Sequence, residues 1–331
     1  MTEAAQAAAP AAPEWRRLLL RLPTVLLIAL IVAVAAWIDL GNTLLGRLTA
    51  PLRGLFGWEA GSGGARLLTG LVLAGLLAGN FALLRRLPFG AQVGIVWAEL
   101  LALSLAFFDS FDLSYAFILQ RLPILIGTGA VTTIYVSAAA IVCASILALV
   151  AALGRLSHHG PSYAVATFYI SFFRGTPLLL QVYLIYLGLP QLGLTLDAVP
   201  SGILALSLCY GAYMAEIFRA GIEGVPKGQT EAARALGLRP TLIMRLVVLP
   251  QALKLVIPPI GNQFIAMLKD SALVSVMGVW ELMFLARTQG RAEFRNLEML
   301  IAAALIYWIL SLAFEIGQAR LERHFGKGDR R

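Results

Sequence analysis

A few polar side chains stand inside long apolar segments of this chain, and they define the chemistry open to it. These residues are Arg174, Gln181, Glu216, Asn262, Gln263 and Lys269. A charged side chain at the centre of a membrane helix costs about 2.5–3.5 kcal/mol, so each such position needs a physical reason. Together they supply hydrogen-bond donors and acceptors, which is what the binding of a small polar solute requires.

The usual parts of reaction chemistry are missing from the sequence. It contains no G-x4-GK[ST] phosphate-binding loop, no HExxH and no G-x-S-x-G motif, and its only histidines are His158, His159 and His324. Cys143 and Cys209 both lie in apolar runs, where a free cysteine packs as a small residue. We therefore expect no catalytic residue, no metal site and no cofactor, and any ATP hydrolysis must come from another subunit.

Two of the polar positions have an alternative interpretation. Arg174 precedes Gly175-Thr176-Pro177, where the proline disturbs a helix and leaves carbonyl groups free to face a cavity. The alternative is an arginine on a short surface helix at the cytoplasmic interface. Glu216 lies three residues before Arg219, so the two can pair on one helix face, and we favour a structural ion pair there over a direct ligand.

The remaining polar positions are Gln181, which follows Arg174 on the same predicted helix, and three residues on the predicted helix 250–275. Asn262 and Gln263 come just after Pro258-Pro259 and offer uncharged donors and acceptors, as Gln181 does. Lys269 and Asp270 come near the outer end of the same predicted helix, where they could snorkel, pair or help to form an outer gate.

The elements that position these residues are membrane helices. Hydrophobic residues make up 59% of the 331-residue chain and charged residues only 13%, whereas soluble proteins are about one-quarter charged. Apolar runs of spanning length recur, and only helices satisfy the backbone of such runs in lipid. The sequence predicts an all-α integral membrane protein with about eight helices, near 22–40, 67–84, 91–108, 124–153, 163–188, 198–219, 250–275 and 298–319.

The distribution of Lys and Arg predicts the orientation of the chain. Most of them fall in segments that share one side when the amino terminus is cytoplasmic, which places both termini and the loop 220–249 inside. The formal net charge is +8, but the basic residues are scattered through short loops. Because they form no basic face with interleaved aromatics, we expect lipid and no nucleic acid as a partner.

Composition divides the chain into four parts. Residues 1–20 read as a cytoplasmic tail, and residues 21–123 as a three-helix membrane extension. Residues 124–320 form the predicted core, and residues 321–331 a basic cytoplasmic tail. The boundary is drawn in the polar stretch 109–123.

A polar and basic insertion lies between the predicted sixth and seventh helices. Pro226 can open a short helix that Gly237 ends with a left-handed cap, and a second short helix from Thr241 can run until Pro250 stops it. The simplest interpretation is a solvated loop whose arginines only satisfy the orientation rule. The spacing favours a docking element: Glu231-Ala232-Ala233, three residues, Gly237, nine residues, then Val247-Val248-Leu249-Pro250.

This spacing resembles the EAA signature, EAA-x3-G-x9-I-x-LP, of permease subunits in binding-protein-dependent ABC importers, with Val247 at the usual isoleucine. The flanks are similar to the polar amino-acid uptake branch, which includes histidine, glutamine and general L-amino-acid permeases. The matching stretches are GTGAVTTIYVSAAAI at 127–141, FRGTPLLLQVYLIYLGLP at 173–190, GAYMAEIFRAGIEGVPKGQ at 211–229 and PPIGNQFIAMLKDSALVSVMGVWEL at 258–282. The resemblance covers about 124–320.

The resemblance implies a permease subunit in a bacterial inner or plasma membrane that moves polar amino acids inward. Its implied partners are a cytoplasmic ABC ATPase dimer, a second permease, identical or homologous, and a periplasmic or extracellular amino-acid-binding protein. It also implies that Glu231, Ala232, Ala233 and Gly237 form the docking surface for the ATPase. We expect Arg234 to add a charged contact at its rim.

Two departures from the family pattern stand out. The leading helices are an addition to the five-helix core and favour a heterodimer of permeases. Ser271-Ala272 replaces the Thr-Ser often seen after Lys-Asp, which puts a hydroxyl-specific role there in doubt.

The outer segment 276–297 alternates aromatic with charged residues. It is predicted as an interfacial amphipathic helix or as a contact for the binding protein through Arg287 and Arg291, and the two interpretations are compatible.

The rival function is an ion-coupled secondary transporter of small polar solutes. Such a transporter would need a buried carboxylate relay and usually a symmetric repeat.

Overall fold

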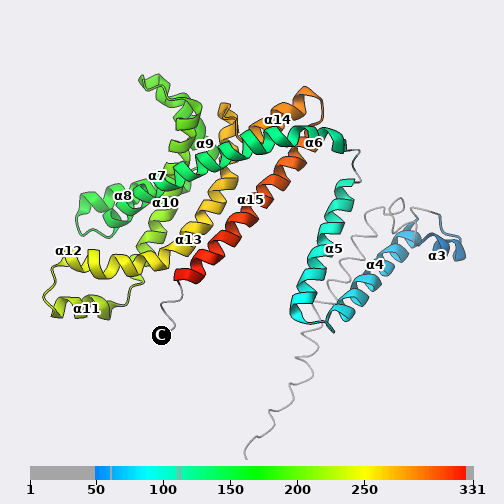
Figure 1. Cartoon of the computed structure of the whole chain (residues 1–331), viewed down its shortest axis with the longest axis horizontal. Coiled ribbons are helices and arrows are strands. Elements are labelled where there is room, and N and C mark those ends of the chain that lie inside the picture. Colours follow the sequence, from blue (N-terminus) through cyan, green and yellow to red (C-terminus); the bar gives the residue numbers. More distant parts are fainter. Residues whose placement is uncertain (1–48, 60–61, 110, 112, 326–331) are drawn as a thin grey trace, which may run out of the picture. The chain divides into compact units, whose positions relative to one another are not determined.

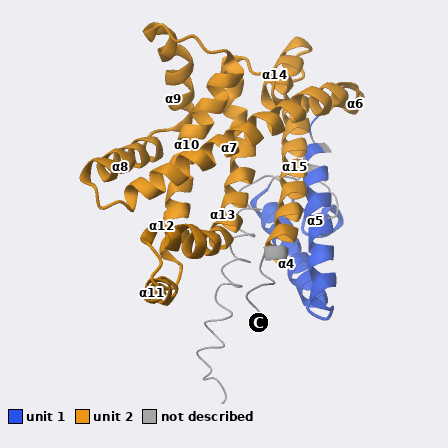
Figure 2. Cartoon of the chain, turned by 60° about the vertical axis from the view of Figure 1, so that its left-hand side comes forward, with its two compact units in different colours: residues 1–111 blue, residues 112–331 orange. Residues whose placement is uncertain are grey.

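The computed structural model describes residues 49–59, 62–109, 111 and 113–325. In these residues the chain forms helices and no strand, as the composition predicts. The chain divides into two compact units, Met1–Phe111 and Asp112–Arg331 (Figure 2). Residues 113–123 thus group with the second unit, whereas the composition assigned them to the extension.

The first unit contains α3 (Ala50–Leu55), α4 (Gly63–Leu84) and α5 (Phe89–Asp109). The Ser62 hydroxyl caps α4 by accepting from the Ala65 amide. Asn80 donates to Glu99 at 2.8 Å and so joins α4 to α5, which gives both polar groups a partner between apolar helices. The predicted helix 22–40 lies outside the described residues.

The second unit begins with one long bent helix. Its parts are α6 (Tyr115–Ile124), the π-helical turn η1 (Leu125–Ala130) and α7 (Val131–Arg155). The sequence predicted the start of this helix near residue 124, after the polar stretch 109–123. The structure keeps Pro123 inside α6, and the wider η1 turn follows it directly.

The next apolar segment is broken rather than continuous. α8 (Gly160–Gly175) and α9 (Leu178–Tyr183) meet at a bend of 108°. α9 continues through η2 (Leu184–Gly188) and η3 (Leu189–Leu192), and α10 (Ala198–Glu223) then runs through the middle of the unit.

The polar insertion forms α11 (Lys227–Ala235) and α12 (Pro240–Ile243). The expectation that Pro250 ends the second helix was wrong. α12 continues through the π-helical turn η4 (Met244–Val248) into α13 (Leu249–Asp270), then η5 (Ser271–Met277). Pro250 lies in the first turn of α13, where its missing N–H costs little.

The chain ends with α14 (Leu282–Ala292) and α15 (Asn296–Phe325). Within the second unit, α11 and α12 lie at one end, and α6 and α14 lie at the other (Figure 1). The core between them is built on small residues: α7 contributes Ala140, Ala144 and Ala148, all fully buried against α10. Small side chains allow this close approach of helices in lipid.

Five helical stretches in the described part of the chain are long and apolar enough to cross a membrane, or six if the bent α8–α9 pair counts as one. They are Gly63–Leu84, Tyr115–Arg155, Ala198–Glu223, Pro240–Met277 and Asn296–Arg323. The shorter apolar helix Phe89–Leu105 adds to these. The helical membrane architecture agrees with the prediction, and the count of eight is not confirmed.

Candidate functional site

The break between α8 and α9 is held open by one side chain. Gln181 is 3% exposed, and its amide nitrogen lies 2.9 Å from the Phe173 carbonyl oxygen, 3.0 Å from the Thr176 carbonyl oxygen and 2.9 Å from the Thr176 hydroxyl. These bonds satisfy carbonyl groups that lose their helical donors at Pro177. The sequence predicted both the interruption and a polar role for Gln181, and the structure assigns Gln181 to bracing the backbone.

A cavity of about 450 Å³ opens at this break. Its walls come from the α8–α9 junction, the middle of α10 and the second half of α13. The lining residues are Arg174, Gly175, Thr176, Pro177, Leu178, Cys209, Tyr210, Tyr213, Gln263 and Asp270. Segments separated by almost a hundred residues therefore meet at one polar site, at the only large helix break found among the described spans.

The cavity carries one positive and one negative side chain, each held by a tyrosine. The Arg174 guanidinium lies 5.3 Å from the centre of the Tyr213 ring, which is a cation–π distance. The Tyr210 hydroxyl donates to Asp270 Oδ2 at 2.7 Å. Because both tyrosines come from α10, this helix orients both charges. The arrangement can bind a solute that carries a carboxylate and an ammonium group.

The structure separates the six predicted pathway residues into two groups. Arg174 and Gln263 line the cavity, and Gln181 supports it from behind. Asn262 instead faces α15, where its side-chain oxygen accepts from Gln318 at 3.1 Å. Lys269 is exposed and does not line the cavity.

Glu216 belongs to an ion-pair chain at the end of α10 near the polar insertion. The predicted Glu216–Arg219 pair is present at 3.0 Å, and Arg155 of α7 binds the other oxygen of Glu216. Arg219 also binds Glu223 at 2.6 Å. Each of these four charged side chains has an oppositely charged partner, so Glu216 acts as a structural link between α7 and α10.

Three cavity residues were not singled out from the sequence. Tyr210 and Tyr213 lie three residues apart, which puts them on one face of α10. Asp270 was noted only with Lys269 as a gate or pair. One sequence signal could have found all three. It is a pair of aromatic residues one turn apart on a helix rich in small residues, together with an isolated charge on another apolar helix.

The polar insertion packs on the unit through one face and leaves the other exposed. Ala233 is buried with Ile222, Val225 and Ile243, so it anchors α11 and is turned away from any partner. The other predicted docking residues are exposed: Glu231, Ala232, Arg234 and Gly237.

The turn after α11 presents an apolar side chain that the sequence analysis did not select. Gly237 has φ +73°, and its amide bonds the Arg234 carbonyl while the Leu238 amide bonds the Ala233 carbonyl. This pair of bonds is a Schellman motif, which explains the glycine. Leu236, just before it, is 80% exposed.

At the opposite end of the unit, Glu281 begins α14 as a fully buried carboxylate. Its oxygens accept from the Phe284 amide at 2.7 Å, the Met283 amide at 2.8 Å and the Tyr307 hydroxyl at 2.7 Å. Burial raises the pKa of this carboxyl to about 7, although these hydrogen bonds and Arg287 act in the opposite direction. Glu281 thus fixes α14, which carries Arg287 and Arg291, onto α15.

Comparison with known proteins gives a consistent match over the second unit. Residues 140–327 match the family described as "Binding-protein-dependent transport system inner membrane component". The chain is 40% identical over 219 residues to the arginine transport system permease protein ArtQ of Bacillus subtilis, covering 66% of this chain and all of that protein. It is 42% identical over 213 residues to the L-cystine transport system permease protein TcyB of the same organism, covering 62% and 89%.

Solved structures give the same match. One chain from a crystal structure of an amino acid ABC transporter with histidines superposes with a TM-score of 0.61 at 38% identity, covering 65% of this chain and all of the other. A chain of the MetNI methionine ABC transporter in an inward-facing conformation superposes with a TM-score of 0.55 at 19% identity, covering 64% and 99%, which supports the fold alone.

Proposed function

Because the chain belongs to the family of binding-protein-dependent transport system inner membrane components, we propose that it forms the membrane pathway of an ATP-driven importer of polar L-amino acids. The observation that carries this proposal is the cavity at the α8–α9 break, where Arg174 and Asp270 present opposite charges. The relatives named for arginine and cystine transport support the same class of solute.

The chemistry of the cavity fits the constant part of an amino acid. A carboxylate can bind the Arg174 guanidinium and an ammonium can bind Asp270, so the two charges of the solute replace water with charged hydrogen bonds. Gln263 adds a neutral contact. A cavity of about 450 Å³ has room for a side chain as well.

Energy enters through the polar insertion in this proposal. The chain has no phosphate-binding loop of its own, so a cytoplasmic ABC ATPase dimer binds Glu231, Ala232, Arg234 and Gly237. Leu236 joins this surface as an apolar contact, because it is 80% exposed in the turn between Arg234 and Gly237. Ala233 supports the surface from beneath.

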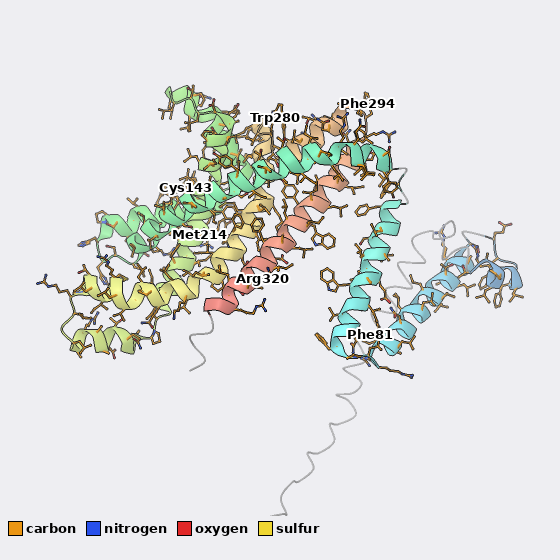
Figure 3. All side chains as sticks on the ribbon, viewed as in Figure 1. Phe81, Cys143, Met214, Trp280, Phe294 and Arg320 are labelled. Atoms are coloured by element: carbon orange, nitrogen blue, oxygen red, sulfur yellow. The ribbon has the colours of Figure 1, made fainter. Side chains whose placement is uncertain are left out.

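The opposite end receives the solute. A periplasmic or extracellular amino-acid-binding protein docks against α14, where Arg287 and Arg291 supply positive charge. Trp280 and Phe294 are 61% and 94% exposed at the same end (Figure 3) and supply aromatic anchors. Both termini are then cytoplasmic, and a second permease, identical or homologous, completes the pathway.

The experiment that tests this function is uptake into proteoliposomes. The chain is reconstituted with its ATPase, binding protein and second permease, and radiolabelled L-arginine, L-glutamine and L-histidine are offered. ATP-dependent uptake of at least one of them is expected. Uptake driven by a proton or sodium gradient without the ATPase would instead establish the secondary transporter.

Two substitutions test the cavity against a matched control. Arg174→Gln and Asp270→Asn should each lower uptake about tenfold or more, which corresponds to about 1.4 kcal/mol for a lost charged contact. Lys269→Gln is the control, because Lys269 precedes Asp270 but does not line the cavity. Equal losses from all three substitutions would contradict the assignment of the cavity.

A further inference from the structure

A second cavity, of about 350 Å³, lies on the outer side of the first one. It is enclosed by α9, η5 and α14, and its polar lining includes Tyr183, Ser275, Arg287, Thr288 and Arg291. The two arginines are one helical turn apart on α14, so their side chains reach the same space. Two guanidinium groups beside hydroxyl groups are a typical environment for a carboxylate.

These two arginines differ from their neighbours at this end of the unit. Arg121 forms an ion pair with Glu293 at 3.4 Å, and Arg295 forms one with Glu298 at 2.9 Å. Among the described residues, no carboxylate lies within 4.0 Å of Arg287 or Arg291.

Glu281 is the carboxylate that could neutralise these two arginines, but its oxygens already accept other hydrogen bonds. Glu281 lies close enough to Arg287 for that arginine to lower its pKa. Both Glu281 oxygens, however, accept hydrogen bonds from the start of α14 and from Tyr307. The positive charge of the outer cavity therefore remains available to a ligand.

The outer and inner cavities share two walls. Leu178 at the start of α9 and Asp270 before η5 line the inner one, while Tyr183 at the end of α9 and Ser275 within η5 line the outer one. A 3₁₀ helix rises about 2 Å per residue, so the walls at Asp270 and Ser275 are about 10 Å apart. The two cavities therefore lie next to each other along α9 and η5.

We propose that the outer cavity is a carboxylate-binding site, which holds an amino acid by its carboxylate group through Arg287 and Arg291 before it enters the inner cavity. This inference rests on the proposed function for the identity of the solute. The outer site lacks an acidic lining residue, so it recognises only the carboxylate, and the ammonium group and side chain are read later, at Asp270 and its neighbours.

Charge-selective labelling tests the site without ATP or binding protein. Cys143 and Cys209 are first replaced by alanine in the full chain, and Thr288→Cys is then introduced. The variant is purified with its partner subunits in lipid nanodiscs. It is labelled with methanethiosulfonate reagents of similar size, one anionic (sulfonate) and one cationic (trimethylammonium). The quantity measured is the ratio of the anionic to the cationic labelling rate. This ratio should be about tenfold higher at Thr288→Cys than at Gln289→Cys, because residue 289 follows on α14 but does not line the cavity.

The arginines are then tested in the Thr288→Cys background. Arg287→Gln with Arg291→Gln should remove the preference, the lysine replacements should keep it, and Arg295→Gln should leave it unchanged because Arg295 is paired with Glu298. Saturating L-arginine should slow labelling, whereas agmatine, which lacks the carboxylate, should not.

Three labelling results would overturn the inference. They are an equal charge preference at residues 288 and 289, a preference that survives both glutamine substitutions, or equal protection by L-arginine and agmatine. If the glutamine substitutions weaken only the affinity for the binding protein, the arginines are a docking contact and no carboxylate site exists. Loss of ATP-driven uptake by the wild-type chain with labelling preserved would refute the proposed function and leave the carboxylate site standing.

Discussion

At the scale of single residues, Glu281 makes stability depend on pH. The folded chain raises its pKa from 4.5 to about 7 by burial, so the folded state holds this proton more tightly than the unfolded state. The free energy of unfolding therefore falls as pH rises from about 4.5 to about 7 and is level above that. One group with this shift contributes about 3 kcal/mol.

The substitution Glu281→Gln tests this contribution. The uncharged amide does not titrate. The free energy of unfolding of the wild type should fall between about pH 5 and pH 7, whereas that of the variant should stay level. The measurement is thermal unfolding of the purified protein across this pH range. Glu293→Gln is the control, because the Glu293 side chain is 53% exposed and its replacement should leave the decline in place; a wild type with no decline would contradict the prediction.

Leu236 tests the other end of the unit at the same scale. It is 80% exposed beside Gly237 and packs on nothing that its loss would destabilise. Leu236→Ser should weaken binding of the ATPase about tenfold, since a buried interface leucine contributes about 1–2 kcal/mol, without a change in thermal stability. The measurement is affinity in detergent. Leu238→Ser is the contrasting variant, because Leu238 packs against the buried cluster around Ala233 and should lower stability instead.

Placement at the cavity could be predicted only where a polar side chain stood out against an apolar background. Arg174 and Gln263 were found in that way, and both line the inner cavity. For the adjacent Lys269 and Asp270, the helix phase decides which one faces the cavity, since consecutive residues point about 100° apart. The sequence did not show which face of α13 turns toward α10, so it left that choice open.

At the scale of elements, the turns after α11 and α14 are of the same type but carry different residues at the strained position. After α11, Gly237 adopts φ +73°, and after α14, Phe294 adopts φ +56°. The Arg295 amide bonds the Gly290 carbonyl at 2.7 Å and the Phe294 amide bonds the Arg291 carbonyl at 3.4 Å, so this is again a Schellman motif. Glycine is the usual residue there, because an L side chain is strained at positive φ.

Phe294→Gly should therefore stabilise the chain by about 1 kcal/mol, because Phe294 is 94% exposed and its side chain contributes little packing. The proposed role of Phe294 as an aromatic anchor predicts that the same variant binds the binding protein more weakly. Both are measured on one sample, by thermal unfolding and by binding-protein affinity. Gly237→Ala is the paired control and should destabilise by a similar amount; a loss of stability in Phe294→Gly would refute the strain argument.

Two prolines explain why element ends were harder to predict than elements. Pro177 sits in an extended conformation with ψ 132° and breaks the helix, because Gln181 satisfies the freed carbonyl groups. Pro250 leaves the helix unbroken, because the π-helical turn before it already shifts the hydrogen-bond pattern. Sequence marks both positions as possible breaks, and tertiary partners and helix register decide between them.

At the scale of the whole second unit, α10 joins the inner cavity to the polar insertion. Tyr210 and Tyr213 line the cavity, and Glu216 binds Arg155 of α7 one turn further on. Near its end, Ile222 packs in the cluster that anchors α11. Movement imposed on α11 can reach the cavity through α10 and also through α13, which continues from α12 and lines the cavity as well. The ion pairs of Glu216 tie α7 to α10.

Breaking the link between these helices should separate ATP hydrolysis from transport. Arg155→Glu puts a like charge beside Glu216, and uptake should fall about tenfold or more while the ATPase activity of the reconstituted complex changes less than twofold. Combining it with Glu216→Arg restores an opposite pair and should recover much of the uptake, as expected for coupled residues in a double-mutant cycle. In the double variant Arg219 loses Glu216 and faces an arginine there, but it keeps Glu223 as a partner, so recovery is expected to be partial. If the double variant is as defective as the single one while both insert and bind the ATPase normally, the pair does not transmit the movement.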